Sequence, residues 1–453
     1  MKNRLDGIAG SQGFKAATLI GLTLIMLIPI TMVNSLIRER SQRAQEVKLD
    51  ISSAAGGELR FGGPVVRIPG TRKVEHSYLD DQGKKSSEYY YEDFSLWSTA
   101  EELDIDLLLN TEDKFRGIFH SPVFTGELSL DGIFDLSGIP DEVEENETLN
   151  IEDAEIIIPF FNQKGIRQIH SANWSGEEID IQPGSRGLKL DSGGIYAKLN
   201  LNEENMQAET PQFFNIRILV RGAGRASFLP LASSTTARIS ADWPAPSFTG
   251  LCLPDFHDIT EKSFNAEWSC SSLSTGIPVN WNNNTIFDPY IINEAYIETD
   301  FMNILDHYDL NERAAKYAIL FIMLPFITLF MFEQFFKRRL HIIHYILAGV
   351  ANIIFYLLLL SLSEHISFNI SYLISAGSVT LMLCLYSWSI LGKDGKAWFM
   401  APVMTAVYFF LFMTLQSEDW ALLIGSVGVF VITASLMFLT RKIDFYQSRQ
   451  NQK

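Results

Sequence analysis

The sequence predicts a mixed fold: an α-helical transmembrane bundle of six spans, with a large antiparallel, sandwich-like β domain between spans one and two. Three observations predict it. Apolar runs near the N-terminus and through the C-terminal third are long enough to cross a hydrocarbon core of roughly 30 Å. Short runs of alternating polar and apolar residues, typical of strands, fill the region between them. Acidic charge is concentrated in that same middle region.

The charge distribution separates the middle of the chain from its ends. Residues 41–310 hold 44 of the 53 acidic residues and 20 of the 36 basic ones, a net charge of −24. The rest of the chain holds 9 acidic and 16 basic residues, a net charge of +7. Because an acidic surface repels phosphate, no nucleic acid partner is expected for the middle region.

Residues 1–15 form a polar N-terminus that we expect in the cytoplasm, and residues 16–37 form the first apolar run. The alternative is a cleaved signal peptide. The run is long for a signal peptide, and no small-x-small cleavage site follows it closely. We therefore predict a retained signal-anchor helix.

Residues 38–316 are predicted to form the β domain. Runs such as LDIDLLL, FFNIRILVRG and STTARISADW alternate with period two, and Gly, Pro, Asn and Asp separate them. In an antiparallel sheet of this kind one face packs inward and the other meets solvent. One large sandwich and two smaller ones both fit the length.

Residues 317–440 are predicted to form a five-helix transmembrane bundle, and residues 441–453 a polar cytoplasmic tail. The five apolar runs are 317–336, 345–362, 370–391, 397–415 and 420–439. Arg338, Arg339 and seven other basic residues follow spans two, four and six, whereas the opposite short loops carry only acidic charges. The positive-inside rule then predicts that both termini are cytoplasmic and that residues 38–316 lie outside.

Four segments follow one another along the chain: GPVVRIP (63–69), ADWPAPSFTG (241–250), RAAKYAILF (313–321) and RRLHIIHYILAG leading into IFYLLLLSLSEH (338–365). In this order they resemble the CreD family of bacterial inner-membrane proteins. The resemblance implies an inner-membrane location, a periplasmic β domain and a role in cell-envelope integrity and stress response, with tolerance of colicins and β-lactams. The family offers no agreed biochemical activity.

Glu364, His365 and Ser361 are a candidate functional cluster at the outer end of span three. Spacings of three and four residues would place them on one helical face. A carboxylate and an imidazole at a membrane edge could relay protons or hold a ligand. The alternative is that they end a helix and lie among water or headgroups.

Asn352, Tyr356 and Glu333 are polar residues inside apolar runs. Helix–helix hydrogen bonding is the ordinary use of a buried amide or hydroxyl in a bundle. Glu333 could pair with Lys337 at i+4, or reach the cytoplasmic interface.

Arg313, Lys316, Arg338 and Arg339 flank the spans and are predicted juxtamembrane anchors for the lipid bilayer, which is the expected partner. Cys252 and Cys270 could form a disulfide if the middle region is exported to an oxidising compartment. Tyr78 and the tyrosines at 89–91 could offer stacking surfaces. Strand alternation is expected to turn at least one of those side chains towards the core.

The sequence has no HExxH, GxxxxGK[ST], SxxK or GxSxG motif, and no cofactor or metal site is expected. The leading hypothesis is a non-enzymatic envelope protein whose β domain binds a protein or an envelope component. The alternative is a membrane-embedded enzyme or transporter with its polar site at the outer end of span three.

Overall fold

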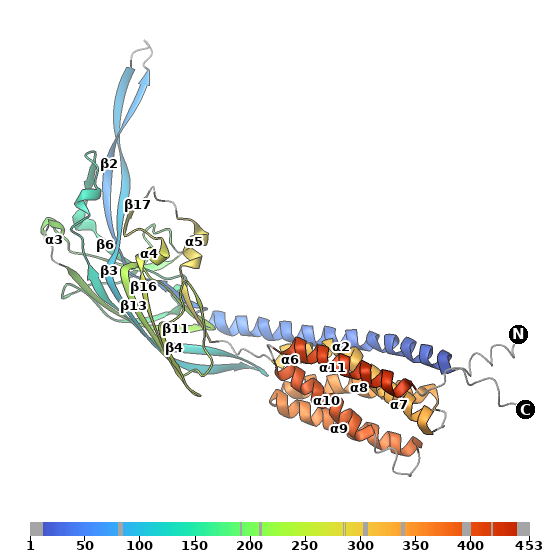
Figure 1. Ribbon diagram of the computed structural model, residues 1–453. Helices are drawn as coiled ribbons and strands as arrows, with labels where there is room; N and C mark the ends of the chain where they lie inside the picture. Colours follow the sequence, from blue (N-terminus) through green and yellow to red (C-terminus); the bar gives the residue numbers. More distant parts are fainter. Residues whose placement is uncertain are drawn as a thin grey trace, which may run out of the picture. The chain divides into compact units, whose positions relative to one another are not determined.

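The computed structural model describes residues 12–79, 85–190, 193–207, 211–283, 285, 287–301, 307–336, 340–391, 400–417 and 420–441. The chain divides into two compact units, which are coloured by sequence in Figure 1. The helical unit comprises Met1–Gln45 and Leu305–Lys453, and the β unit comprises Glu46–Ile304.

The helical unit is built from long apolar helices. They are α2 (Gln12–Ala54, which continues into the β unit), α6 (His307–Lys316), α7 (Ala318–Phe336), α8 (Ile342–Ser363), α9 (Phe368–Leu391), α10 (Met400–Gln416) and α11 (Ala421–Thr440). Helices α6 to α11 gather into one bundle (Figure 1), and α2 contacts this bundle through Lys15, Arg38 and Arg40. A packed bundle of this kind satisfies its backbone polar groups within each helix, as a hydrocarbon environment requires.

In the described part of the chain, three helical segments are long and apolar enough to cross a membrane: Ala17–Ala54, Ile342–Ser363 and Phe368–Ile390. A fourth is added if His307–Lys316 and Phe321–Gln334, which meet at 44°, form one bent span. Helix α10 is apolar but shorter. The structure therefore supports a multi-helix membrane unit, and the count of six spans stays a prediction.

The β unit contains two sheets and short helices. Its strands are β1 (Leu59–Gly62), β2 (Val65–Leu79), β3 (Lys85–Arg116), β4 (Phe119–Phe134), β5 (Glu147–Leu149), β6 (Glu155–Pro159), β7 (Ile166–Trp174), β8 (Glu177–Glu178), β9 (Gln182–Pro183), β10 (Gly194–Lys198), β11 (Gln212–Ala223), β12 (Arg225–Leu229), β13 (Ala232–Ala241), β14 (Ser247–Gly250), β15 (Phe256–Ile259), β16 (Phe264–Ser271), β17 (Asn280–Asn282) and β18 (Ile297–Asp300). The helices are η1 (Pro140–Glu142), η2 (Ile151–Asp153), η3 (Gln163–Gly165), α3 (Glu203–Gln207), α4 (Ser272–Thr275) and α5 (Pro289–Glu294).

The larger sheet follows the order β8-β7-β11-β4-β3-β2-β6-β10-β9, and β5, β13, β15, β16 and β17 join it beside that path. The smaller sheet has the order β1-β12-β18-β14. Among the described strands, all pairings are antiparallel except β13 with β3 and β1 with β12. The prediction of a large antiparallel β domain after an apolar helix is confirmed.

Strand β3 is the central element of the β unit, because it pairs with β2, β4, β13 and β17 along its 32 residues. Both sheets contribute to one hydrophobic core. The ring of Phe228 in the smaller sheet meets that of Trp268 in the larger sheet edge-on, with 6.0 Å between their centroids. Edge-to-face pairs of this kind add to the stabilisation from burial alone.

One part of the larger sheet extends past the core. Thr71–Leu79 of β2 pairs with Lys85–Asp93 of β3, and these two segments are called the ribbon from here on. In Figure 1 the ribbon projects beyond the other strands of the β unit. A two-stranded ribbon without a covering layer has both faces open to solvent, which makes it marginally stable by itself.

Candidate functional site

Four buried polar residues of α8 lie on one line along the helix: Tyr345, Asn352, Tyr356 and Ser363. Their spacings of seven, four and seven residues are close to whole helical turns. Three of the four side chains bond to another helix, as described below. Helix α8 is therefore hydrogen-bonded to α6, α7 and α10.

At one end of this line, Glu333 of α7 is bound by two residues. The Lys15 ammonium of α2 lies 2.5 Å from both carboxylate oxygens, and the Tyr345 hydroxyl donates to Oε2 at 3.0 Å. Lys15 also donates to the carbonyl of Leu340 at 2.8 Å. The side chain of Glu333 is 9% exposed, so this is a nearly buried ion pair. Among the described residues the partner of Glu333 is Lys15, and the predicted pairing with Lys337 lies outside the described residues.

In the middle of the line, Asn352 links α8 to α10. Its side-chain oxygen accepts from the Tyr408 hydroxyl at 3.1 Å, and its amide donates to the Ala348 carbonyl at 2.9 Å. Tyr372 of α9 donates to the Tyr408 carbonyl at 2.7 Å. The Tyr356 hydroxyl is buried and has no hydrogen-bond partner among the described residues. Asn352 thus occupies the position of a helix-linking amide.

At the other end, two bonds join α8 to α6. Asn311 donates to the Ser363 hydroxyl at 2.9 Å, and the Tyr308 hydroxyl donates to the Glu364 carboxylate at 3.0 Å. The guanidinium of Arg40, from α2, lies 3.8 Å from the same carboxylate. The Glu364 side chain is 10% exposed. A carboxylate therefore lies at each end of α8, Glu333 of α7 at one and Glu364 at the other, and each contacts a cation from α2 and a tyrosine hydroxyl. We call the two groups the clasps.

A functional cluster of Ser361, Glu364 and His365 at the outer end of span three stays a prediction, and the contacts of Glu364 run to other helices. Ser361 and His365 are exposed, and within the described part of the chain neither side chain has a hydrogen bond or ion pair with Glu364. Helix α8 ends at Ser363, so Glu364 and His365 lie in the turn that follows it.

Of the four predicted juxtamembrane anchors, two lie in the described part of the chain. Lys316, which is exposed, lies 3.7 Å from Glu312 one turn earlier on α6, and Arg313 is half-buried on the same helix. Arg338 and Arg339 lie outside the described residues. A role of these four side chains at the lipid surface stays a prediction.

The sequence interpretation missed Lys15, Arg40, Tyr308 and Asn311 as site residues, although a signal for Lys15 was present. Lys15 begins the first apolar run and Glu333 ends the second. Antiparallel neighbours place such positions on the same side of a bundle. An unpaired carboxylate inside an apolar run is costly, so a basic residue at the same predicted depth was its natural partner.

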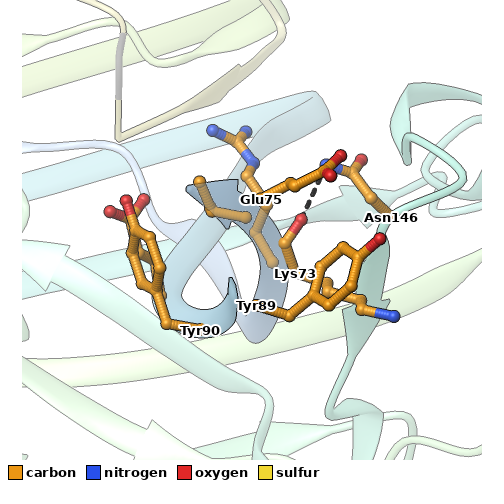
Figure 2. A pocket seen from close by; sticks show the side chains of 8 residues that line it. Lys73, Glu75, Tyr89, Tyr90 and Asn146 are labelled. Carbon is orange, nitrogen blue, oxygen red and sulfur yellow. Dashed lines mark hydrogen bonds between the residues drawn. The ribbon is translucent and has the colours of Figure 1, made fainter. Parts of the chain in front are cut away.

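A second candidate site lies on the ribbon. An open hollow of about 560 Å³ is lined by side chains of both ribbon strands and by Asn146. Figure 2 shows Tyr89 and Tyr90 projecting to opposite sides of the ribbon, with Lys73 beside Tyr89. The Lys73 ammonium lies 4.2 Å from the centre of the Tyr89 ring. The exposed fractions of Tyr89, Tyr90 and Tyr91 are 58%, 45% and 71%, so the expectation that one of them faces the core is wrong.

The side chains of this site suit the binding of another molecule through aromatic and polar contacts. In the part of the chain that the structure describes, no group of three or more His, Cys, Asp or Glu side chains could hold a metal ion. Exposed tyrosines offer flat apolar rings with a polar hydroxyl at the edge. Such side chains are enriched in binding interfaces.

Cys252 and Cys270 lie with their sulfur atoms 2.9 Å apart, as unbonded thiols. Burial, together with the neighbouring Cys252 thiol, raises the pKa of the Cys270 thiol well above its ordinary value. Two thiols in contact, of which Cys270 is buried and Cys252 half-buried, are well placed to be oxidised to a disulfide in an oxidising compartment.

We expect protein isolated from cells without reductant, then acid-quenched and denatured, to react with a maleimide at Cys384 only. After reduction, all three cysteines should react. The denaturation step is needed because a buried thiol of raised pKa reacts slowly even when reduced. Three reactive cysteines before reduction would contradict the disulfide.

The apolar helices of the helical unit and the separate β unit define a membrane protein that carries a large β domain. The family model described as inner membrane protein CreD matches residues 11–446, and the chain belongs to this family. It is also 30% identical over 445 residues to the inner membrane protein CreD of Escherichia coli (strain K12). The matched region covers 96% of this chain and 93% of that relative.

Proposed function

We propose that this chain is a multi-pass inner-membrane protein with both termini in the cytoplasm, and that its β domain is periplasmic and binds a protein or another envelope component. Through that binding it would support the integrity of the cell envelope under stress. The topology draws support from the clasps. Lys15 contacts Glu333 and Arg40 contacts Glu364, and in each pair the proposed topology puts both residues on the same side of the membrane.

The observation that carries the binding proposal is the set of exposed tyrosines on the ribbon. Tyr89, Tyr90 and Tyr91 are at least 45% exposed on a segment that extends past the hydrophobic core. Exposed aromatic side chains cost free energy in water, and a ribbon with two open faces gains stability when a partner covers them. Tyrosine is also enriched among the residues that dominate binding energy.

Glu364 fits the role of a structural contact better than that of a reacting group. Its carboxylate is bonded to Tyr308 and lies near Arg40, whereas Ser361 and His365 are exposed. The matching group at Glu333 has the same composition, a carboxylate with a cation and a tyrosine. Two like groups at the two ends of α8 favour a role in holding the bundle together over an enzyme or transport site.

The experiment uses a deletion strain with a phenotype under detergent, β-lactam or colicin. Wild type or the Tyr89→Ser/Tyr90→Ser/Tyr91→Ser variant is returned at matched protein levels. Each truncated tyrosine at a binding hot spot costs about 2 kcal/mol, so the triple variant should fail to restore growth. Tyr290→Ser, at a 67% exposed tyrosine of α5, is the matched control and should restore it.

Full restoration by the triple variant would refute the proposal that the ribbon is a binding surface. Thermal unfolding of the purified proteins accompanies the test. The three side chains lie outside the core, and we expect the triple variant to unfold at the same temperature as wild type.

A further inference from the structure

The edge of β2 in the ribbon already takes a strand from its own chain. β5 (Glu147–Leu149) pairs with Gly70–Arg72. One residue further along, the N–H of Lys73 donates to the Asn146 carbonyl at 2.8 Å, and the Lys73 carbonyl accepts from the Asn146 side-chain amide at 3.2 Å (Figure 2). Beyond Asn146 no described strand pairs with this edge.

The open backbone groups follow from strand alternation. The Pro69 carbonyl accepts from the Asn150 N–H at 2.8 Å on this edge, and Lys73 uses both of its backbone groups there. Because backbone groups of an antiparallel strand face alternate edges, those of Glu75 and Ser77 face the same edge as those of Lys73. The backbone groups of Val74 and His76 face β3 instead. The edge therefore presents a row of N–H and C=O groups that continues the line of β5.

The hollow of the ribbon lies at the point where β5 stops. Lys73 and Glu75 line it from β2, Tyr89 and Tyr90 line it from β3, and Asn146 closes the end nearest β5. By register, Glu75 stands opposite Tyr89 and Val74 opposite Tyr90. Successive side chains along the edge therefore lie on alternate faces of the ribbon, and on each face a tyrosine of the neighbouring strand β3 lies beside them.

We infer that the edge of β2 from Glu75 onwards binds an extended polypeptide segment of a partner protein, which adds to the ribbon as a strand in line with β5. Main-chain hydrogen bonds supply the affinity in this mode, and pockets for alternate side chains supply the specificity. Alternate side chains of such a segment lie on the face of Val74 and Tyr90, which is apolar, and on the face of Lys73, Glu75 and Tyr89, which carries charges. The segment we expect therefore has apolar residues at every second position. This inference rests on the proposed function and names the class of partner.

The test separates the backbone of Glu75 from its side chain. Glu75→Pro removes the outward N–H and places a ring against any added strand, yet leaves the bonds between β2 and β3 intact. Glu75→Ala removes the carboxylate and keeps the backbone. The full chain in detergent is panned against random peptides displayed on phage, and recovered peptides are synthesised and measured by fluorescence anisotropy.

We expect recovered peptides with alternating apolar residues whose affinity falls at least about tenfold with Glu75→Pro, because a backbone hydrogen bond is lost and the adjacent strand is obstructed. Glu75→Ala should bind as wild type does. Recovery of no peptide, or binding that survives Glu75→Pro, would overturn the inference. So would a dimer of the purified protein that Glu75→Pro abolishes, because a second copy would then occupy the edge.

The deletion strain distinguishes this failure from that of the proposed function. If growth requires the three ribbon tyrosines but tolerates Glu75→Pro, strand addition is wrong while binding at the ribbon stands. If growth tolerates both variants, the proposed function fails and the inference fails with it. Loss of growth with both variants, together with rescue by Glu75→Ala, supports the inference.

Discussion

Replacement of Glu155 by alanine is expected to destabilise the β domain by about 3–5 kcal/mol, the usual effect of removing one partner from a buried ion pair. The Glu155 side chain on β6 is 4% exposed and contacts two guanidinium groups. Arg67 of β2 lies 2.8 Å away, and Arg186 of the β9–β10 loop lies 2.7 Å away. Alanine would leave Arg67, which is itself largely buried, without its carboxylate.

The effect should be concentrated around the β9–β10 loop. Arg186 has a φ of 51°, a left-handed conformation that is unfavourable for a residue with a Cβ, and its guanidinium stacks on Tyr196. Leu188 and Leu190 of the same loop are buried in a hydrophobic cluster. The ion pair with Glu155 thus holds the loop in a conformation that would otherwise cost free energy.

Hydrogen exchange on the full chain checks this prediction, read on peptides covering β6 and β10. Amides of these strands should exchange faster in Glu155→Ala than in wild type. Glu267→Ala is the control, because its partner Arg238 is 51% exposed and exposed ion pairs contribute only about 0–1 kcal/mol. Equal protection in Glu155→Ala and wild type would show that the buried pair contributes nothing.

The strands could be predicted where they are buried on one face and could not where they are buried on both. Alternation is clear from Glu102 to Asn110 of β3, where buried and exposed residues alternate strictly. From Phe94 to Ala100 every residue is buried, because both faces of β3 meet hydrophobic clusters there. Periodicity disappears in such a stretch, so the sequence interpretation saw separate short runs where one long strand exists.

The ribbon shows what tertiary context adds to a local pattern. Three consecutive tyrosines predict a strand, and in a sheet packed on a core at least one of them would face inward. Here β2 and β3 continue past the core, so both of their faces remain exposed. Nothing local to residues 89–91 indicates how far a strand extends beyond the layer that covers it.

The candidate site in the helical unit was predictable in its residue types, but among its partners only Lys15 had a signal in the sequence. Asn352, Glu333 and Glu364 are polar residues in or beside apolar runs, which the sequence shows directly. Reasoning by i, i+3 and i, i+4 spacing relates only residues of the same helix. Their actual partners Tyr408, Lys15 and Tyr308 lie on other helices, and only the packing of the bundle brings them into contact.

Replacement of Glu333 by alanine is expected to destabilise the helical unit by about 3–5 kcal/mol, because it removes the nearly buried carboxylate and leaves the Lys15 ammonium, whose side chain is 28% exposed, without its counter-charge. The Tyr345 hydroxyl, which is fully buried, loses its acceptor in the same change. Glu312→Ala is the matched control. Glu312 is 33% exposed and pairs with the exposed cations Arg38 and Lys316, so its removal should cost about 0–1 kcal/mol.

Unfolding of the purified chain by dodecyl sulfate in mixed micelles, followed by helical circular dichroism, measures both variants. The exchanged pair Lys15→Glu/Glu333→Lys restores opposite charges and should recover part of the loss, whereas Lys15→Glu alone should be the least stable variant, because two carboxylates then share one site. Additive effects of the two exchanges would contradict a direct pair. Coupling between them would mean that α2 is held to α7 and α8 by the charge of Glu333, beyond its apolar packing.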